Sequence, residues 1–411
     1  MSILTLNCRS SSVRYQLFDQ EKKEVLARGM VERVEIGDSY ITLEAPGRVN
    51  CRKESDCPDH RAAVALILQT LTDGEVGILP DAGPIMAVGH RVVHGGENFT
   101  RSSLIDDRVL AAVKAVEELA PLHNAPNIAG IDAARALLPH IDHVAVFDTA
   151  FHQTMPPHAY LYALPYEWYE KYGVRRYGFH GASHLYALKR GAELLKKRPE
   201  ECNMITIHIG NGVSLCAVRN GISIDTSMGL TPLEGAVMET RCGDIDPGIL
   251  VFIMQAENLS ARELDRILNQ KSGMLGITGR FSRQRDVLEG AIQGDRGCRL
   301  ALDMTAYRLK KYIGAYCAVV GPLDAVVFVS SVGRGEWPVR ELALEGMEAF
   351  GIRLDRERNL LGGGENHAAL VSADDSPVRV FVVPADEDLI LAENTAAVLA
   401  GEHPAEVPEF F

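Results

Sequence analysis

Apolar residues along this chain follow two periods, which together predict alternating strands and helices. Short apolar runs bounded by turn residues predict strands at Ser2–Leu6, Val13–Phe18, 85–92 and 143–147, and again at Met204–Ile209, Val213–Val218, 222–225, 325–329 and 378–383. Apolar residues at helical spacing predict helices at 107–119, 126–138, 182–196, 285–293, 298–320, 338–350 and 386–399. This alternation is typical of an α/β protein.

Two segments resemble copies of one unit, in which a strand, a small-residue turn and a second strand follow one another. The turn is polar at Asn7–Ser12 and reads Gly-Asn-Gly at 210–212. Each first strand ends at a polar side chain, Asn7 or His208. Because such turns direct backbone N–H groups toward a bound anion, the pattern predicts a duplicated architecture with a ligand enclosed between the halves.

Length, composition and net charge indicate the number of domains and the kind of partner. A chain of 411 residues, 46% hydrophobic and 24% charged, is expected to form two domains. We expect one domain at 1–150 together with a returning helix at 386–400, a second at 151–385, and a loosely ordered tail at 401–411. The net charge of -13 and the lack of a basic run argue against nucleic acid as a partner.

The cysteines and the N-terminus predict a location. Eight cysteines occur without a CxxC pair, which is typical of reduced thiols in a cytoplasmic protein. Met1 leads directly into a predicted strand, so no signal peptide is expected, and no apolar run is long enough to span a membrane. We therefore expect a cytoplasmic protein with no membrane partner.

The segment from Asp225 to Pro247 reads as a shaped loop, because glycine and proline interrupt it repeatedly. It presents Arg241 among small residues. A guanidinium on a rigid loop suits carboxylate or phosphoryl oxygens, since it donates several hydrogen bonds in a fixed geometry. The alternative for an isolated arginine is a surface salt bridge.

This loop resembles a signature of the acetate and butyrate kinase family. Further family motifs follow in order and spacing at Met1–Arg14, Val88–Glu97, Ala120–Asn124, Phe147–His152, Tyr177–His184, Ile207–Gly212 and Val383–Asp388, so the resemblance covers residues 1 to about 396. It implies the duplicated ribonuclease-H-like fold of actin, sugar kinases and Hsp70, with a central cleft. It also implies a homodimer that transfers a phosphoryl group from ATP to acetate with Mg²⁺.

The chemistry of this reaction explains the residue types. A carboxylate acceptor is already ionised at pH 7 and needs no general base, so the task is to bring two anions together and stabilise the transferring charge. The resemblance assigns Arg91 and Arg241 to the acceptor carboxylate and the phosphoryl group, and His180 to a hydrogen bond in the transition state. We interpret Asp148, called catalytic in the family, as a residue that orients the arginines or the metal shell.

The resemblance also supplies binding residues. The acceptor site would comprise Arg91, Val93, Leu122, His123, Phe179 and Pro232. Phosphate and nucleotide contacts would come from Ser12, Arg14, His208, Gly210, Asn211, Gly212, Arg283, Arg285, Ser331, Gly333 and Gly335, and Mg²⁺ would lie at Asn7 and Glu387. A structural role stays open for His123 and His208. The i, i+4 pairs His90–His94 and His180–His184 have a zinc-like spacing, but no neighbouring Glu or Cys completes a ligand set.

The donor side departs from the family pattern at Arg9, Glu239, Arg283, Gln284 and Ser330–Gly335. Added positive charge there favours a polyanion, so pyrophosphate or another polyphosphate is an alternative donor to ATP. A sugar kinase of the same superfamily would need an aspartate base, and the paired arginines argue against one. A degenerate paralogue that binds acyl phosphate without turnover is a further alternative.

Overall fold

The computed structural model describes residues 2–117, 120–330, 336–363 and 367–402. It divides into two compact units. Unit 1 comprises Met1–Gln153 and Asp386–Phe411, and unit 2 comprises Thr154–Ala385.

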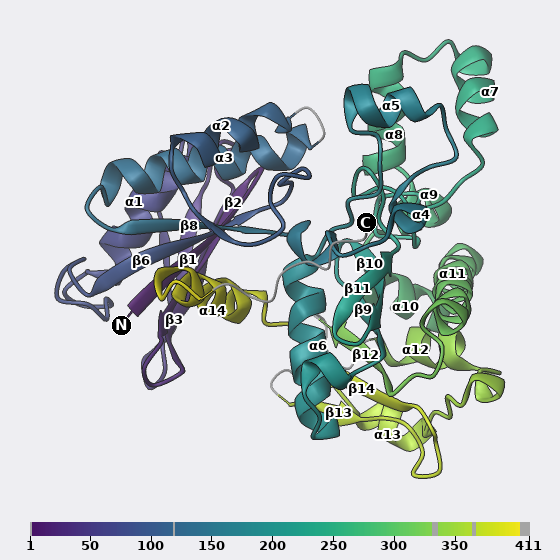
Figure 1. The fold of residues 1–411 in the computed structure, drawn as a ribbon. Coiled ribbons are helices and arrows are strands. Elements are labelled where there is room, and N and C mark those ends of the chain that lie inside the picture. The colour runs from purple at the N-terminus through teal and green to yellow at the C-terminus, as the bar shows by residue number, and fades with distance from the viewer. Residues whose placement is uncertain (1, 118–119, 331–335, 364–366, 403–411) are drawn as a thin grey trace. The chain divides into compact units, whose positions relative to one another are not determined.

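Unit 1 contains a sheet of eight strands in the order β5-β4-β3-β2-β1-β6-β8-β7 (Figure 1). The strands are β1 (Ser2–Arg9), β2 (Ser12–Asp19), β3 (Glu24–Glu32), β4 (Tyr40–Glu44), β5 (Cys51–Glu54), β6 (Ile85–Val92), β7 (Ser103–Leu104) and β8 (Asp142–Phe147). Strands β1 to β5 pair antiparallel in sequence, whereas β6 runs parallel to both β1 and β8. The parallel centre brings the C-terminal ends of β1, β6 and β8 to one edge of the sheet.

Helices cover both faces of this sheet (Figure 1). The helices are α1 (His60–Leu71), α2 (Asp107–Ala115), α3 (Pro121–Leu137) and α14 (Glu387–Leu399). Successive side chains of β1 alternate between the faces, so Leu4 joins the core under α1 and α3, while Ile3 packs with Ala392 and Ala396 of α14. Gly89 permits the close approach of α14, because a Cβ there would lie 2.3 Å from Oγ1 of Thr395.

Unit 2 repeats the same strand pattern in a sheet of six strands, ordered β11-β10-β9-β12-β14-β13. The strands are β9 (Met204–Ile209), β10 (Val213–Arg219), β11 (Ile222–Thr226), β12 (Ala325–Ser330), β13 (Ala369–Leu370) and β14 (Arg379–Pro384). The antiparallel run β9-β10-β11 matches β1-β2-β3, and the parallel strands β12 and β14 match β6 and β8. This correspondence confirms the duplicated ribonuclease-H-like fold.

The helices of unit 2 are α4 (Pro157–Tyr160), α5 (Tyr166–Tyr172), α6 (Gly181–Leu195), α7 (Pro247–Glu257), α8 (Ala261–Gln270), α9 (Gly273–Thr278), α10 (Gln284–Ile292), α11 (Arg296–Val320), α12 (Trp337–Leu344) and α13 (Arg356–Leu361). Helix α6 packs on β9, β12 and β14, whereas α11 packs on β9 and β10. The predicted helix 338–350 ends early, and the chain turns at Gly346, whose φ is 73°.

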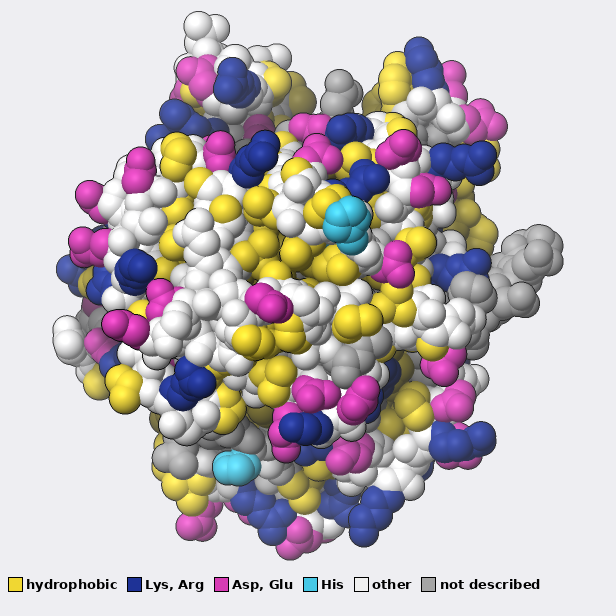
Figure 2. Space-filling model, turned by 90° about the vertical axis from the view of Figure 1, so that its left-hand side faces the viewer, with side chains coloured by type: hydrophobic (Ala, Val, Ile, Leu, Met, Phe, Trp, Pro, Cys, Tyr) yellow, Lys and Arg dark blue, Asp and Glu magenta, His cyan; other side chains and the backbone are white. Residues whose placement is uncertain are grey.

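The predicted segments correspond to observed elements, and the signature loop contains no helix or strand between Thr226 and Pro247. The elements that were not predicted are β3, β4, β5, β7, β13, α1, α4, α5, α7, α8, α9 and α13. No helix in the described part of the chain has the length and apolar character required to cross a membrane. On the face drawn in Figure 2, acidic and basic side chains are interspersed, and neither sign forms a continuous patch.

Candidate active site

Three predicted residues of unit 1 meet where β1, β6 and β8 end. Arg91, in β6, donates from Nε to Oδ1 of Asp148 at 3.0 Å and from Nη2 to Oδ2 at 2.5 Å. Its Nη1 donates to Oδ1 of Asn7 at 3.3 Å. Asp148 directly follows β8 and is 1% exposed. The carboxylate therefore fixes the plane of the guanidinium through a bidentate contact.

Charge around Arg91 is balanced by carboxylates from two elements. Burial lowers the pKa of Arg91, but the charges of Asp148 and Glu387 outweigh burial and raise the pKa above its ordinary value. Partial desolvation and the charge of Arg91 lower the pKa of Arg9, whose side chain is still exposed, and the charge of Glu387 partly offsets this shift. Glu387 is the first residue of α14. Its carboxylate thus belongs to the same electrostatic cluster as Arg91.

Arg14, a predicted phosphate ligand, is held by an ion pair. Its Nε lies 2.9 Å from Oδ2 of Asp388, whose side chain is 4% exposed. Burial raises the pKa of Asp388, and the charge of Arg14 opposes that shift. Ser12 lies at the start of β2 and is half-buried. The structure therefore joins Arg14 to α14.

A second cluster forms in unit 2 around Gly212. A Cβ at this glycine would lie 3.2 Å from Nε2 of His180 and 3.2 Å from Nη1 of Arg241. Arg241 also donates from Nη1 to the carbonyl of Pro232 at 2.9 Å. The missing side chain of Gly212 thus leaves a space that an imidazole and a guanidinium both border. Donors around one small space suit a transferring anionic group.

The loop that carries Arg241 is held by partly buried polar contacts. Arg176 donates to the carbonyls of Thr226, Ser227 and Met228 at 2.9 to 3.2 Å. Further along the loop, Tyr312 donates to Oδ2 of Asp244 at 2.7 Å. These contacts satisfy carbonyl and carboxylate oxygens in a segment without regular structure, and they keep the loop rigid.

His180 has an unusual backbone conformation for its residue type. Its φ of 59° and ψ of 28° place it in the left-handed region at the N-cap of α6. Such a conformation costs a non-glycine residue roughly 1–3 kcal/mol and is concentrated at functional sites. Nδ1 of His180 lies 2.8 Å from Oγ of Ser214. The surrounding contacts therefore hold this ring in a defined orientation.

The predicted phosphate turn follows β9 directly. His208 packs its ring 4.2 Å from the ring of His180, and its Nδ1 lies 2.8 Å from Oγ of Ser183. The N–H of Gly210 donates to the carbonyl of Gly212 at 3.0 Å, which closes the turn and leaves Asn211 exposed. The structure thus brings His180, His208, Gly212 and Arg241 together.

The residues predicted to form the acceptor pocket are divided between the two units. Val93 is 7% exposed and follows β6, and His123 is half-buried in α3. Phe179 is 1% exposed and precedes α6. The side chain of Leu122 lies outside the described residues. Val93 and His123 thus belong to unit 1, and Phe179 and Pro232 belong to unit 2.

At two of the donor-side positions that depart from the family pattern, the added charges have opposite signs and interact with each other. Burial raises the pKa of Glu239, and the charge of Arg283 lowers it, so two of the substituted positions form an opposite-charge pair. Arg285 forms an exposed ion pair with Glu289 at 3.1 Å. Gln284 is 7% exposed, and its Nε2 forms no hydrogen bond within the described residues. Ser331, Gly333 and Gly335 lie outside the described residues, as does Arg334.

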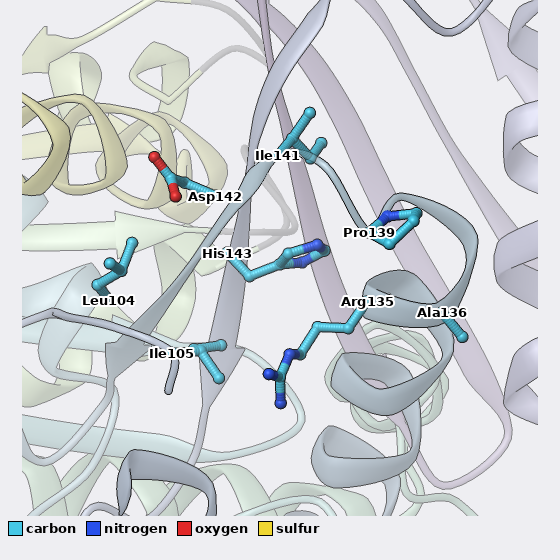
Figure 3. A pocket seen from close by; sticks show the side chains of 8 residues that line it. All are labelled: Leu104, Ile105, Arg135, Ala136, Pro139, Ile141, Asp142 and His143. Atoms are coloured by element: carbon cyan, nitrogen blue, oxygen red, sulfur yellow. The ribbon is translucent and has the colours of Figure 1, made fainter. Parts of the chain in front are cut away.

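A separate cavity of about 390 Å³ opens in unit 1 (Figure 3). It is lined by Leu104, Ile105, Arg135, Ala136, Pro139, Ile141, Asp142 and His143. Asp142 points away from Arg135 and His143 (Figure 3). Behind the cavity, Nδ1 of His143 lies 3.0 Å from Nε2 of the buried His90. None of the predicted site residues lines this cavity.

Comparison with known proteins identifies the family. The profile of the Acetokinase family matches residues 2–393. The chain belongs to the acetokinase family. An acetate kinase of Geobacter metallireducens is 66% identical over 403 residues, which cover 98% of this chain and 96% of that protein.

Solved structures of the acetokinase family share the fold. The Porphyromonas gingivalis acetate kinase is 44% identical with a TM-score of 0.91, over 97% of this chain and 99% of that one. A propionate kinase from Francisella tularensis is 36% identical with a TM-score of 0.90, over the same shares of the two chains. These relatives do not favour the alternative in which pyrophosphate or a degenerate binding role replaces ATP-dependent turnover.

Sequence reasoning missed the residues that support His180. His184 pairs through Nε2 with Oγ of Ser214 and through Nδ1 with Oγ1 of Thr206, each at 2.8 Å. The signal was a polar residue in otherwise apolar strands, since Thr206 and Ser214 are both fully buried. The zinc-like spacing of His180 and His184 therefore corresponds to two rings that share one serine. Among the described residues, no cluster of three metal-ligating side chains occurs.

Proposed function

We propose that this chain catalyses the reversible, magnesium-dependent transfer of a phosphoryl group from ATP to acetate, giving acetyl phosphate and ADP. The observation that carries this proposal is the presence of two cation clusters, one around Arg91 and one around Gly212, in a chain 66% identical to an acetate kinase. Acetate arrives ionised, so the reaction needs positive charge and positioning and no base.

Each side chain has a proposed role in direct in-line transfer. Arg91 binds the acceptor carboxylate, and Arg241 and His180 donate to the oxygens of the transferring phosphoryl group. Asp148 acts as a positioning residue, because both of its oxygens accept from Arg91. A carboxylate held in this way is poorly placed to accept a proton from a substrate. The glycine turn at 210–212 and His208 are proposed to contact the donor phosphates.

The residues of unit 1 fit a magnesium ion. Asn7 offers an amide oxygen and Glu387 a carboxylate, and both belong to the cluster around Arg91. Mg²⁺ usually keeps several waters and takes only one or two protein carboxylates, so two ligands suffice. When bound, the ion would neutralise charge on the donor phosphates.

A homodimer is proposed from an exposed apolar surface in unit 2. None of the eleven residues of α7 is buried, and Ile249, Val251 and Phe252 are 47%, 59% and 68% exposed. Exposed apolar surface of this kind marks protein–protein contact sites. A second copy of the chain is the occupant we propose. A cytoplasmic location is also proposed, because all eight cysteines, which lie within the described residues, are free thiols.

The decisive experiment traps acyl phosphate with hydroxylamine. Purified protein is supplied with magnesium and acetate, propionate or butyrate, and with ATP, GTP, pyrophosphate or tripolyphosphate. We expect acetate with ATP to give the highest kcat/KM and propionate to be weaker. Absence of hydroxamate with every pair would refute the proposed function, and turnover with pyrophosphate in place of ATP would reassign the donor.

A further inference from the structure

His180 stands at one end of a buried chain of hydrogen bonds that the proposed roles do not use. Its Nδ1 lies 2.8 Å from Oγ of Ser214, which lies 2.8 Å from Nε2 of His184. Nδ1 of His184 lies 2.8 Å from Oγ1 of Thr206. Thr206, His184 and Ser214 each have 0% exposure. Water therefore does not reach the groups that set the protonation pattern of the outermost ring.

The chemistry of the hydroxyl groups restricts this pattern. A serine hydroxyl has one proton, so Ser214 donates to one histidine and accepts from the other. When Thr206 donates to Nδ1 of His184, the Nε2–H of that ring donates to Ser214. Ser214 then donates to Nδ1 of His180. Each hydroxyl and each shared ring nitrogen is satisfied in this order, which places the ring proton of His180 on Nε2. The reverse order, in which His180 donates to Ser214 and Ser214 donates to His184, satisfies the same contacts but places that proton on Nδ1. Only the first order leaves Nε2 of a neutral His180 able to donate to a phosphoryl oxygen.

Nε2 of His180 borders the space beside Gly212. A Cβ at Gly212 would lie 3.2 Å from Nε2 and equally far from Nη1 of Arg241. The ring of His208 is 4.2 Å away, and Nδ1 of His208 faces Ser183. A guanidinium and a second imidazole beside His180 disfavour a further positive charge on its ring. A neutral ring can donate from Nε2 only if its tautomer is fixed.

We propose that Ser214 and His184 are positioning residues that hold His180 as the Nε2–H tautomer, so that an uncharged ring donates to the transferring phosphoryl group. This role rests on the proposed phosphoryl transfer. If these residues only packed the interior, substituting one of them would change stability and substrate binding. A network that sets the tautomer changes the rate and its dependence on pH.

The test compares Ser214→Ala with Ser223→Ala. Ser223 is the comparison, because it is a fully buried serine of the same sheet whose hydroxyl accepts from Cys216. The thiol of Cys216 also interacts with Thr206, so Ser223 adjoins the far end of the chain, whereas Ser214 contacts His180 itself. We expect Ser214→Ala to lower kcat by about 10- to 100-fold, which is at or below the low end of the roughly 10²- to 10⁴-fold typical of general acid–base catalysis, because His180 itself stays in place. Both KM values should change less than about threefold. Ser223→Ala is expected to keep kcat within about threefold of the wild type.

Two further measurements separate orientation from packing. In Ser214→Ala, kcat should rise as the pH falls from about 8 to 6. Without Ser214 the neutral ring of His180 can carry its proton on either nitrogen, whereas the imidazolium always carries one on Nε2. The wild type should not show this rise. His184→Gln keeps a donor for Ser214, whereas His184→Leu does not. The kcat of His184→Gln should therefore be at least about tenfold higher than the kcat of His184→Leu. Nitrogen NMR of histidine-labelled wild type should show the proton of His180 on Nε2.

The outcomes are distinct. An inactive wild type would count against the proposed function itself. An active wild type whose Ser214→Ala variant matches Ser223→Ala in kcat would overturn the role of Ser214. If Ser214→Ala does not fold, the NMR measurement decides, and a proton on Nδ1 of neutral His180 would overturn the proposal.

Discussion

Replacing Arg91 by alanine should damage stability and catalysis together, because the side chain serves both. Asp148 is 1% exposed and accepts two hydrogen bonds from Arg91. Breaking a buried ion pair by removing one partner costs about 3–5 kcal/mol. The loss of a preorganised donor to transition-state charge costs about 3–4 kcal/mol in the barrier, or roughly 100- to 1,000-fold in kcat.

The assay pairs thermal unfolding with initial rates of acyl phosphate formation. For a domain of 150–250 residues, roughly 2–4 °C accompany each kcal/mol, so Arg91→Ala should lower Tm by about 6–20 °C. Arg241→Ala is the control, because its guanidinium donates to the uncharged carbonyl of Pro232. It should lose a similar factor in kcat with a much smaller change in Tm.

A double variant tests the cause of the instability. Arg91→Ala combined with Asp148→Asn removes the isolated charge, so part of the lost Tm should return while kcat stays low. The reasoning fails if Arg91→Ala unfolds at the wild-type temperature, or if it turns over near-normally at saturating substrate.

Three further outcomes follow from the structure. Burial lowers the pKa of both His90 and His143, so below about pH 6.5 the unfolded chain binds protons that the native state does not. The free energy of unfolding should therefore fall there by up to about 1.4 kcal/mol for each pH unit and each histidine. Urea titrations between pH 5 and 7.5 should show this slope, and the slope should be smaller in His90→Gln. Val93→Ala should raise the propionate-to-acetate ratio of kcat/KM by about tenfold, since one methylene is worth roughly 1–3 kcal/mol, and an unchanged ratio would remove Val93 from the acceptor pocket. Glu387→Gln should raise the magnesium concentration for half-maximal rate by about tenfold or more, as expected for loss of a carboxylate ligand, whereas an equal requirement in both proteins would place the ion elsewhere.

Local patterns in the sequence were sufficient for much of the fold. The central strands are short, mainly apolar runs between turn residues, and every residue of β9 and β12 is buried, as this pattern predicts. Strand β3 escaped prediction because its buried positions, such as Ala27 and Val31, are separated by exposed and partly exposed ones. Helix α7 escaped because an apolar segment without a buried face lacks a helical period.

The sequence by itself located the motifs that contain Arg91, Asp148, His180 and Arg241, since their order and spacing match a known family. It could not show what each side chain touches. Arg14 pairs with Asp388 from the far end of the chain, and the pKa of Glu239 responds to Arg283.

Only the tertiary structure placed Thr206, His184 and Ser214 in one line behind His180. These residues come from two strands and a helix. In the sequence, Thr206 and Ser214 appear as ordinary polar residues of core strands, and His184 appears only as one half of a zinc-like pair. A hydrogen bond depends on the direction of both side chains within a few tenths of an ångström. That direction is fixed when strands pair and a helix packs across them, so no local pattern in the sequence contains it.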